Sequence, residues 1–241
     1  MSFAVTLHPF DERDLVAGLL PAVVRADGSE ALLARLYTDP DAETLIRQWM
    51  PRMREAWEAL RAGDGAPWAA VVDFAAGVLS GFLHPVYFLG DIGLSYWRGG
   101  GECPFRPYTR SMAILAARVP EIGAAVSEIP DGFAGPSSAG TFVAATDVML
   151  LLRDIERRPG LFAARLTHAG YDAPAVLAAL LEVLHYARER RLAVMELTDA
   201  VDPKQQLTLF PESHLRGAWR GGLHPEARRR VDLALAGSHG G

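Results

Sequence analysis

Apolar residues recur at helical spacing over most of the chain and at strand spacing in only a few short segments. Within 40–62, residues Leu45, Trp49, Met53 and Leu60 mark one face of an amphipathic helix. Because proline removes a backbone donor inside a helix, Pro51 predicts a kink there or two consecutive helices. A second apolar stripe predicts a long helix over 174–191.

Strand-like patterns are short. Residues 3–7, 141–143 and 192–197 favour strands, and we expect the last two to pair. We therefore predict an α+β, mainly helical fold, with a helical N-terminal half and a small sheet packed among helices in the C-terminal half. A single domain over 1–241 is expected, and the alternative is two halves, 1–130 and 140–241, joined by the small-residue segment 131–139.

The most apolar segment, 69–90, is long enough to raise the question of a membrane span. Asp73, Gly77 and the pair His84 and Pro85 interrupt it, and a bilayer penalises such residues. We predict a buried core helix with an extended tail and no membrane contact.

Composition narrows the classes of function. The formal net charge of the 241 residues is -5, which argues against direct binding of nucleic acid, because phosphates attract a surplus of Lys and Arg. Cys103 is the only cysteine, so an internal disulfide and a thiolate-rich metal site are excluded. No basic segment precedes an apolar one at the start, so no signal peptide is predicted and we expect a cytoplasmic protein.

Aromatic and polar residues that could carry chemistry follow the apolar segment. His84, Tyr87, Asp91 and Tyr96 are candidates for a catalytic pocket in which the imidazole acts as a base or a ligand. Residues 81–90 resemble the G-x-x-H-P-x-x-H-L-G run of questin-oxidase-like helical proteins, with Phe88 in place of the second histidine. That resemblance implies an oxygenase-like helical enzyme as an alternative function.

A metal site is a weaker alternative. Glu182 and His185 form an E-x-x-H pair on the predicted helix 174–191, the spacing found in carboxylate-bridged di-iron sites. Such sites need a second E-x-x-H pair, which the chain does not contain, so we favour a solvated helix face. No phosphate loop, dinucleotide fingerprint or nucleophile elbow is present, and the cofactor stays unknown.

Residues Gln206, Leu207, Thr208, Leu209 and Phe210 resemble the Q-L-x-L-F peptide by which bacterial replication and repair proteins dock on the sliding clamp. This resemblance implies an exposed, extended peptide and a clamp-docking accessory protein as a further alternative. Packing of the same apolar side chains on their own domain is the other interpretation.

The second half of the chain resembles small α+β bacterial proteins that accompany polymorphic toxins. The segment from Ala187 through Arg190, Leu192 and Glu196 to Asp199 carries their A-x-x-R-x-L-x-x-x-E-x-x-D ending. The resemblance implies an immunity or accessory protein that acts by protein–protein contact without catalysis, which is our first hypothesis. Expected binding residues are Trp97, Arg106, Gln206, Leu209 and Phe210, and the aromatic anchors to be located are Trp49, Trp57, Tyr87, Tyr96, Trp97 and Trp219.

Overall fold

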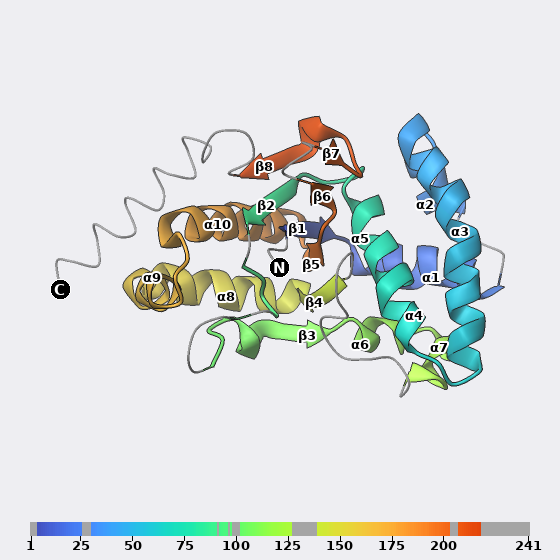
Figure 1. Cartoon of the computed structure of the whole chain (residues 1–241), viewed down its shortest axis with the longest axis horizontal. Helices are drawn as coiled ribbons and strands as arrows, with labels where there is room; N and C mark the ends of the chain where they lie inside the picture. The colour runs from blue at the N-terminus through green and yellow to red at the C-terminus, as the bar shows by residue number, and fades with distance from the viewer. Residues whose placement is uncertain are drawn as a thin grey trace.

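A mixed six-stranded sheet with helices on both faces forms the fold (Figure 1). The computed structural model describes residues 4–25, 30–90, 92–95, 97, 102–126, 139–202 and 207–217. The strands of the main sheet are β1 (Val5–Phe10), β2 (Val86–Gly90), β3 (Thr109–Ser111), β4 (Ala139–Val143), β5 (Ala193–Thr198) and β8 (Leu215–Gly217). Their order is β3-β4-β5-β1-β2-β8, and every neighbouring pair is antiparallel except β2 and β8. The short strands β6 (Val201–Asp202) and β7 (Leu207–Thr208) pair separately.

Strand β1 lies in the middle of the sheet, between β5 and β2. Its alternation sends Val5 and Leu7 to one face and Thr6, His8 and Phe10 to the other. All of its residues are buried, because helices cover both faces. Two polar side chains are tolerated there since Thr6 Oγ1 and His8 Nε2 share a hydrogen bond of 2.8 Å.

Three helices cover the face that carries Leu7. They are α8 (Ala145–Arg157), α9 (Pro159–His168) and α10 (Ala173–Arg190), at the left in Figure 1. Helix α10 confirms the predicted helix over 174–191. The Asp172 carboxylate accepts a hydrogen bond from the Ala175 N–H at its start, and Arg191 ends it in the left-handed conformation with φ 57°.

The N-terminal helices cover the opposite face. They are η1 (Asp14–Leu19), α1 (Leu20–Arg25), α2 (Glu30–Leu36), α3 (Pro40–Arg61), α4 (Ala66–Trp68), η2 (Ala69–Asp73) and α5 (Phe74–Ser80). Helix α3 continues through Pro51 as one element, so the prediction of two consecutive helices is wrong. Pro51 is exposed, where water can satisfy the carbonyl that loses its donor. Short elements complete the fold: η3 (Arg106–Tyr108), α6 (Ala113–Ala116), α7 (Pro120–Gly123) and η5 (Glu212–His214).

The apolar segment 69–90 folds as a buried helical run followed by a strand. The run η2–α5 is buried almost throughout, and β2 begins at Val86. The predicted core helix with an extended tail is therefore confirmed. Over the parts of the chain that the structure describes, no helix combines the length and apolarity that crossing a membrane requires.

The α+β, mainly helical class is confirmed, but the sheet is not confined to the C-terminal half. Strands β1, β2 and β3 come from the first 111 residues and share one sheet with β4, β5 and β8. The pairing of β4 with β5 is the one expected from the sequence. Strand β2 is the extended tail expected after the core helix, but its pairing with β1 and β8 was not predicted, because it joins segments far apart in the chain.

Candidate functional site

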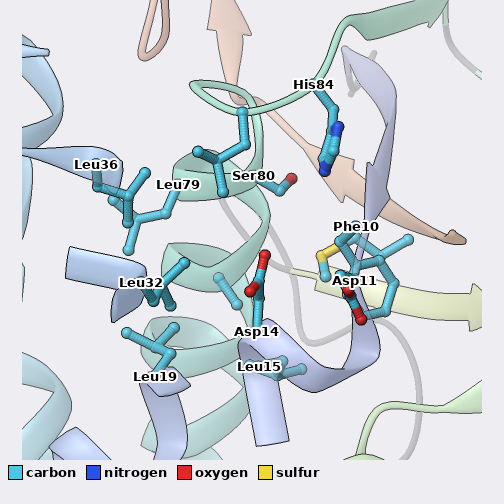
Figure 2. A pocket seen from close by; sticks show the side chains of 13 residues that line it. Phe10, Asp11, Asp14, Leu15, Leu19, Leu32, Leu36, Leu79, Ser80 and His84 are labelled. Atoms are coloured by element: carbon cyan, nitrogen blue, oxygen red, sulfur yellow. The ribbon is translucent and has the colours of Figure 1, made fainter. Parts of the chain in front are cut away.

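A narrow cleft lies on the face of the sheet that the N-terminal helices cover (Figure 2). It is bounded by the end of β1, helices η1 and α2, and the end of α5. It holds about 380 Å³ of space, including the part open to solvent. The residues that line it are Phe10, Asp11, Asp14, Leu15, Leu19, Leu32, Leu36, Ala76, Leu79, Ser80, Leu83, His84 and Met195. Nine of these are apolar and four are polar or charged, as in most small-molecule sites.

Helical spacing brings the apolar lining together. Leu32 and Leu36 lie one turn apart on α2, while Leu79 belongs to the last turn of α5 and Leu83 to the turn that follows it. Leu15 and Leu19 belong to η1, which has π-helical hydrogen bonding. π-helical turns are frequent at functional sites, because the wider turn redirects side chains.

Two of the four polar side chains are satisfied by the protein itself. Asp14 pairs with Arg35, whose Nη1 lies 2.9 Å from both carboxylate oxygens. Ser80 Oγ donates to the Gly77 carbonyl at 2.6 Å. Neither group requires a ligand.

The other two polar side chains have unused capacity. One carboxylate oxygen of Asp11 accepts from the Arg13 N–H at 2.8 Å, its only hydrogen bond among the described residues. His84 Nδ1 lies 3.3 Å from the Tyr186 hydroxyl, and His84 Nε2 is buried with no hydrogen-bond partner in the described part of the chain. A buried polar atom without a partner costs folding free energy, so a ligand that satisfies it gains affinity.

His84 is neutral at physiological pH. Burial, reinforced by the positive charges of Arg35 and Arg190 and opposed by Asp11, lowers the pKa of His84 to about 4. The tautomer follows the bond to Tyr186: if the hydroxyl donates to Nδ1, Nε2 carries the proton and donates, and otherwise Nε2 accepts. Either form can hydrogen-bond to a ligand.

The predicted catalytic set is only partly assembled. His84 lines the cleft, but Tyr87 is buried in β2 among the residues of the opposite face. Their rings are linked through Tyr186, whose ring centre is 6.1 Å from that of His84 and 6.4 Å from that of Tyr87. Asp91 and Tyr96 lie outside the described residues.

The other polar residues that line the cleft with His84 are Asp11, Asp14 and Ser80, none of which was in the predicted catalytic set. In the sequence, Asp11 is followed by Glu12 and Asp14, which is typical of the acidic first turn of a helix and indicates no binding role. No local pattern relates it to His84, because 72 intervening residues separate the two and the pairing of strands brings them together.

The predicted binding residues do not gather at one place. Trp97 packs against Tyr171 with ring centres 5.7 Å apart, and Arg106 is exposed in η3. Leu209 is 38% exposed, but Phe210 is only 4% exposed and its ring lies 5.5 Å from that of His8. Gln206 lies outside the described residues, and a docking peptide would need Phe210 released from the core.

Most of the expected aromatic anchors contribute to packing. Trp57 and Tyr87 are buried, and Trp49 is partly buried and stacked on Phe74. Tyr96 and Trp219 lie outside the described residues. Protein–protein contact of the immunity type stays a prediction.

Glu182 and His185 do not form a joint ligand set. His185 Nε2 lies 3.2 Å from a carboxylate oxygen of Glu156 on the neighbouring helix α8. Among the residues that the structure describes, no three His, Cys, Asp or Glu side chains are grouped so that they could hold a metal ion.

Glu196 and Asp199, the two acidic residues of the A-x-x-R-x-L-x-x-x-E-x-x-D segment, stabilise the fold. The buried Glu196 carboxylate accepts hydrogen bonds from the Leu94 N–H, the Ser95 N–H and the Ser95 hydroxyl. Asp199 accepts from the Ala4 N–H at 3.1 Å, next to the first residue of β1. Both therefore fasten distant segments to the end of β5.

Comparison of the chain with protein-family models, with curated proteins and with solved structures found no match. Its function is inferred from the residues of the cleft.

Proposed function

We propose that the His84 cleft binds a small amphipathic molecule that has an apolar body and a hydroxyl or amine head group. The observation that supports this most directly is the buried His84 Nε2, which has no partner in the described residues and lies at the polar end of an otherwise apolar cleft. The apolar body of the ligand would displace water from the leucine-rich lining, and each buried methylene contributes roughly 0.8 kcal/mol.

The charges around the cleft favour a neutral or cationic head group. Asp14 is neutralised by Arg35, whereas Asp11 has no ion pair in the described residues, and His84 is uncharged at pH 7. A carboxylate head group would approach the charge of Asp11, and the two arginines whose charges reach His84 are already paired, Arg35 with Asp14 and Arg190 with Glu189. An ammonium group would instead pair with Asp11 and donate to the histidine.

An enzymatic function in the same cleft is the second candidate, and a specific observation favours it. The neutral imidazole of His84 is oriented by the Tyr186 hydroxyl, and in the tautomer whose Nε2 carries no proton it can accept one from a bound head group. Ligand binding is the simpler proposal and comes first, because any reaction at His84 requires it.

Three probes of equal chain length test the proposal: octylamine, octanol and octanoate. We expect octylamine and octanol to raise the thermal unfolding midpoint and to give saturable heats in calorimetry, because a ligand of the native state stabilises it. Octanoate should bind at least about tenfold more weakly than octylamine, because its carboxylate is repelled by Asp11. A difference of about 1.4 kcal/mol in binding free energy is enough for that factor.

Two variants identify the site. His84→Ala should weaken octanol and octylamine alike, and Asp11→Asn should reduce the preference for octylamine over octanol. The matched controls are Asp41→Asn, an exposed aspartate on α3, and Leu33→Ala, a half-buried leucine of α2 that does not line the cleft. Absence of saturable binding by all three probes, or equal binding by His84→Ala and the wild type, would refute the proposal.

A further inference from the structure

A second groove lies among the helices on the other side of the sheet, between segment 104–108 and helix α9. It holds about 460 Å³, including its open part, and is lined by Pro104, Pro107, Tyr108, Arg158, Leu161, Phe162 and Arg165. The prolines and Leu161 supply apolar surface, and the two arginines supply positive charge. This groove is independent of the His84 cleft.

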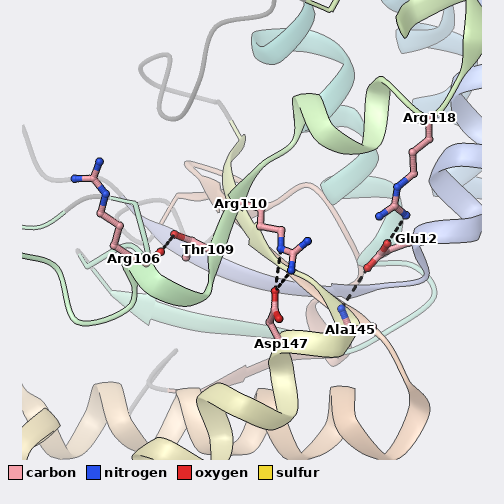
Figure 3. Close-up of polar contacts among 7 residues, drawn as sticks. All are labelled: Glu12, Arg106, Thr109, Arg110, Arg118, Ala145 and Asp147. Carbon is pink, nitrogen blue, oxygen red and sulfur yellow. Dashed lines mark hydrogen bonds and ion pairs between the residues drawn. The ribbon is translucent and has the colours of Figure 1, made fainter.

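Side-chain contacts hold the wall of the groove against α8 and α9. The rings of Phe105 and Phe162 are stacked with centres 6.0 Å apart. The Tyr108 hydroxyl donates to Asp154 on α8 at 2.6 Å. Further along the same helix, Arg110 pairs with Asp147, the contact drawn in Figure 3. The groove is thus formed before any partner binds, which reduces the entropy cost of binding.

The positive charges around the groove outnumber the negative ones. Asp154 is shared by Tyr108, by Arg158 at 3.4 Å and by Arg153 at 3.5 Å. Three further arginines are exposed and have no ion pair among the described residues: Arg106, Arg157 and Arg165. In Figure 3 the Arg106 guanidinium points away from the contacts of its neighbours. This cluster of arginines stands out on a chain whose formal net charge is -5.

Exposed apolar side chains continue the groove along the helices. Leu150, Asp154 and Arg158 follow one another at four-residue intervals and so lie on one side of α8 and its end. Leu150 is exposed, and Leu161 in the groove itself is 45% exposed. Exposed leucine side chains therefore lie on both helices near the arginines, with Asp154 between Leu150 and Arg158.

We propose that this groove binds an acidic, leucine-containing segment of a partner protein. Carboxylates of the segment would pair with Arg158 and Arg165, because guanidinium groups bind carboxylates through two hydrogen bonds. An apolar side chain of the segment would cover Leu161 between the two prolines. Alternating charge and apolar contacts of this kind give both steering and specificity.

The features of the groove favour a protein over a nucleic acid. Single-stranded nucleic acid binds through exposed aromatic rings that stack on bases, but Phe162 is buried and the Tyr108 hydroxyl is bonded to Asp154. An exposed leucine side chain cannot donate a hydrogen bond to a phosphate, whereas it packs well against an apolar side chain.

The test measures fluorescence anisotropy of a labelled peptide that alternates glutamate with leucine. Two comparison peptides replace glutamate by glutamine or leucine by serine, and a labelled oligothymidylate of equal charge serves as the nucleic-acid probe. The full chain is compared with the double variant Arg158→Gln/Arg165→Gln. The matched control is Arg52→Gln/Arg54→Gln, which removes two exposed arginines from α3 at the other end of the molecule (Figure 1).

We expect the glutamate–leucine peptide to bind best and to bind more weakly as salt rises, because salt screens the ion pairs. The groove variant should weaken it by about tenfold or more, and the α3 variant should leave it within about twofold. Equal binding by the two variants would overturn the proposal, as would oligothymidylate binding that is as tight and as dependent on Arg158 and Arg165.

Discussion

Asp73 gives the sharpest prediction about pH and stability. Its side chain is buried at the end of η2, with 4% of the residue exposed. Burial raises the pKa of Asp73 to about 7 from the ordinary 3.8, and the nearby Trp68 indole offsets only part of that rise. The Trp68 N–H makes no regular hydrogen bond among the described residues. Asp73 is therefore protonated in the folded protein under conditions where it is ionised in the unfolded chain.

The sign and size of the effect follow from proton linkage. Between about pH 4 and pH 7 the folded state binds more protons than the unfolded state, so the free energy of unfolding falls as pH rises. One pKa unit corresponds to about 1.4 kcal/mol, so the rise at Asp73 corresponds to a loss of up to about 4 kcal/mol. Above about pH 7 both states are ionised and the loss is complete.

The Asp73→Asn variant isolates this contribution, because asparagine has the same shape and does not titrate. Urea unfolding of the variant and the wild type should give similar free energies near about pH 4, and the variant should gain by up to about 4 kcal/mol near about pH 8. Asp41→Asn, an exposed aspartate on the first turn of α3, is the matched control. If the difference between wild type and Asp73→Asn is constant over this range, Asp73 is not buried as a neutral acid.

Four further substitutions test the packing, each by the free energy of unfolding in urea. Glu196→Ala should cost at least about 3 kcal/mol, because three donors in segment 94–95 lose their acceptor; a loss below about 1 kcal/mol would contradict those bonds. Phe210→Ala should cost about 3–5 kcal/mol, because the ring is buried, whereas the exposed Leu209→Ala should cost below about 1 kcal/mol. Similar losses for the two variants would show that segment 207–210 is not packed as described. Gly77→Ala should cost about 1–3 kcal/mol, since an added methyl would overlap Leu197, and an unchanged stability would count against this contact.

Local pattern was enough to predict the long helices and two of the strands. Helices α3 and α10 followed from apolar residues at three- and four-residue intervals, and the pairing of β4 with β5 from two short β-prone runs. For strand β2 the sequence indicated only an extended tail after the core helix and not its partner strands. The helix-breaking effect expected of Pro51 was overridden, because its exposed position on α3 leaves the rest of the helix packed.

The residues of the candidate site were likewise predicted only in part. The sequence singled out His84, since an imidazole at the end of a highly apolar run is unusual in composition alone. It placed Tyr87 beside His84, but the Tyr87 side chain is buried among the residues of the other core cluster and does not line the cleft. Asp11 and Tyr186 are far from His84 in sequence and gave no signal.

The sequence by itself determined the class of fold, the limits of the long helices and the histidine around which a site could form, because these depend on periodicity and composition over a few turns. Tertiary structure decided that β1 enters the centre of the sheet between β5 and β2, and with it which charges face His84. Such pairings join segments many residues apart, and their free energy comes from burial of two surfaces against each other. No local stretch of the chain contains both surfaces.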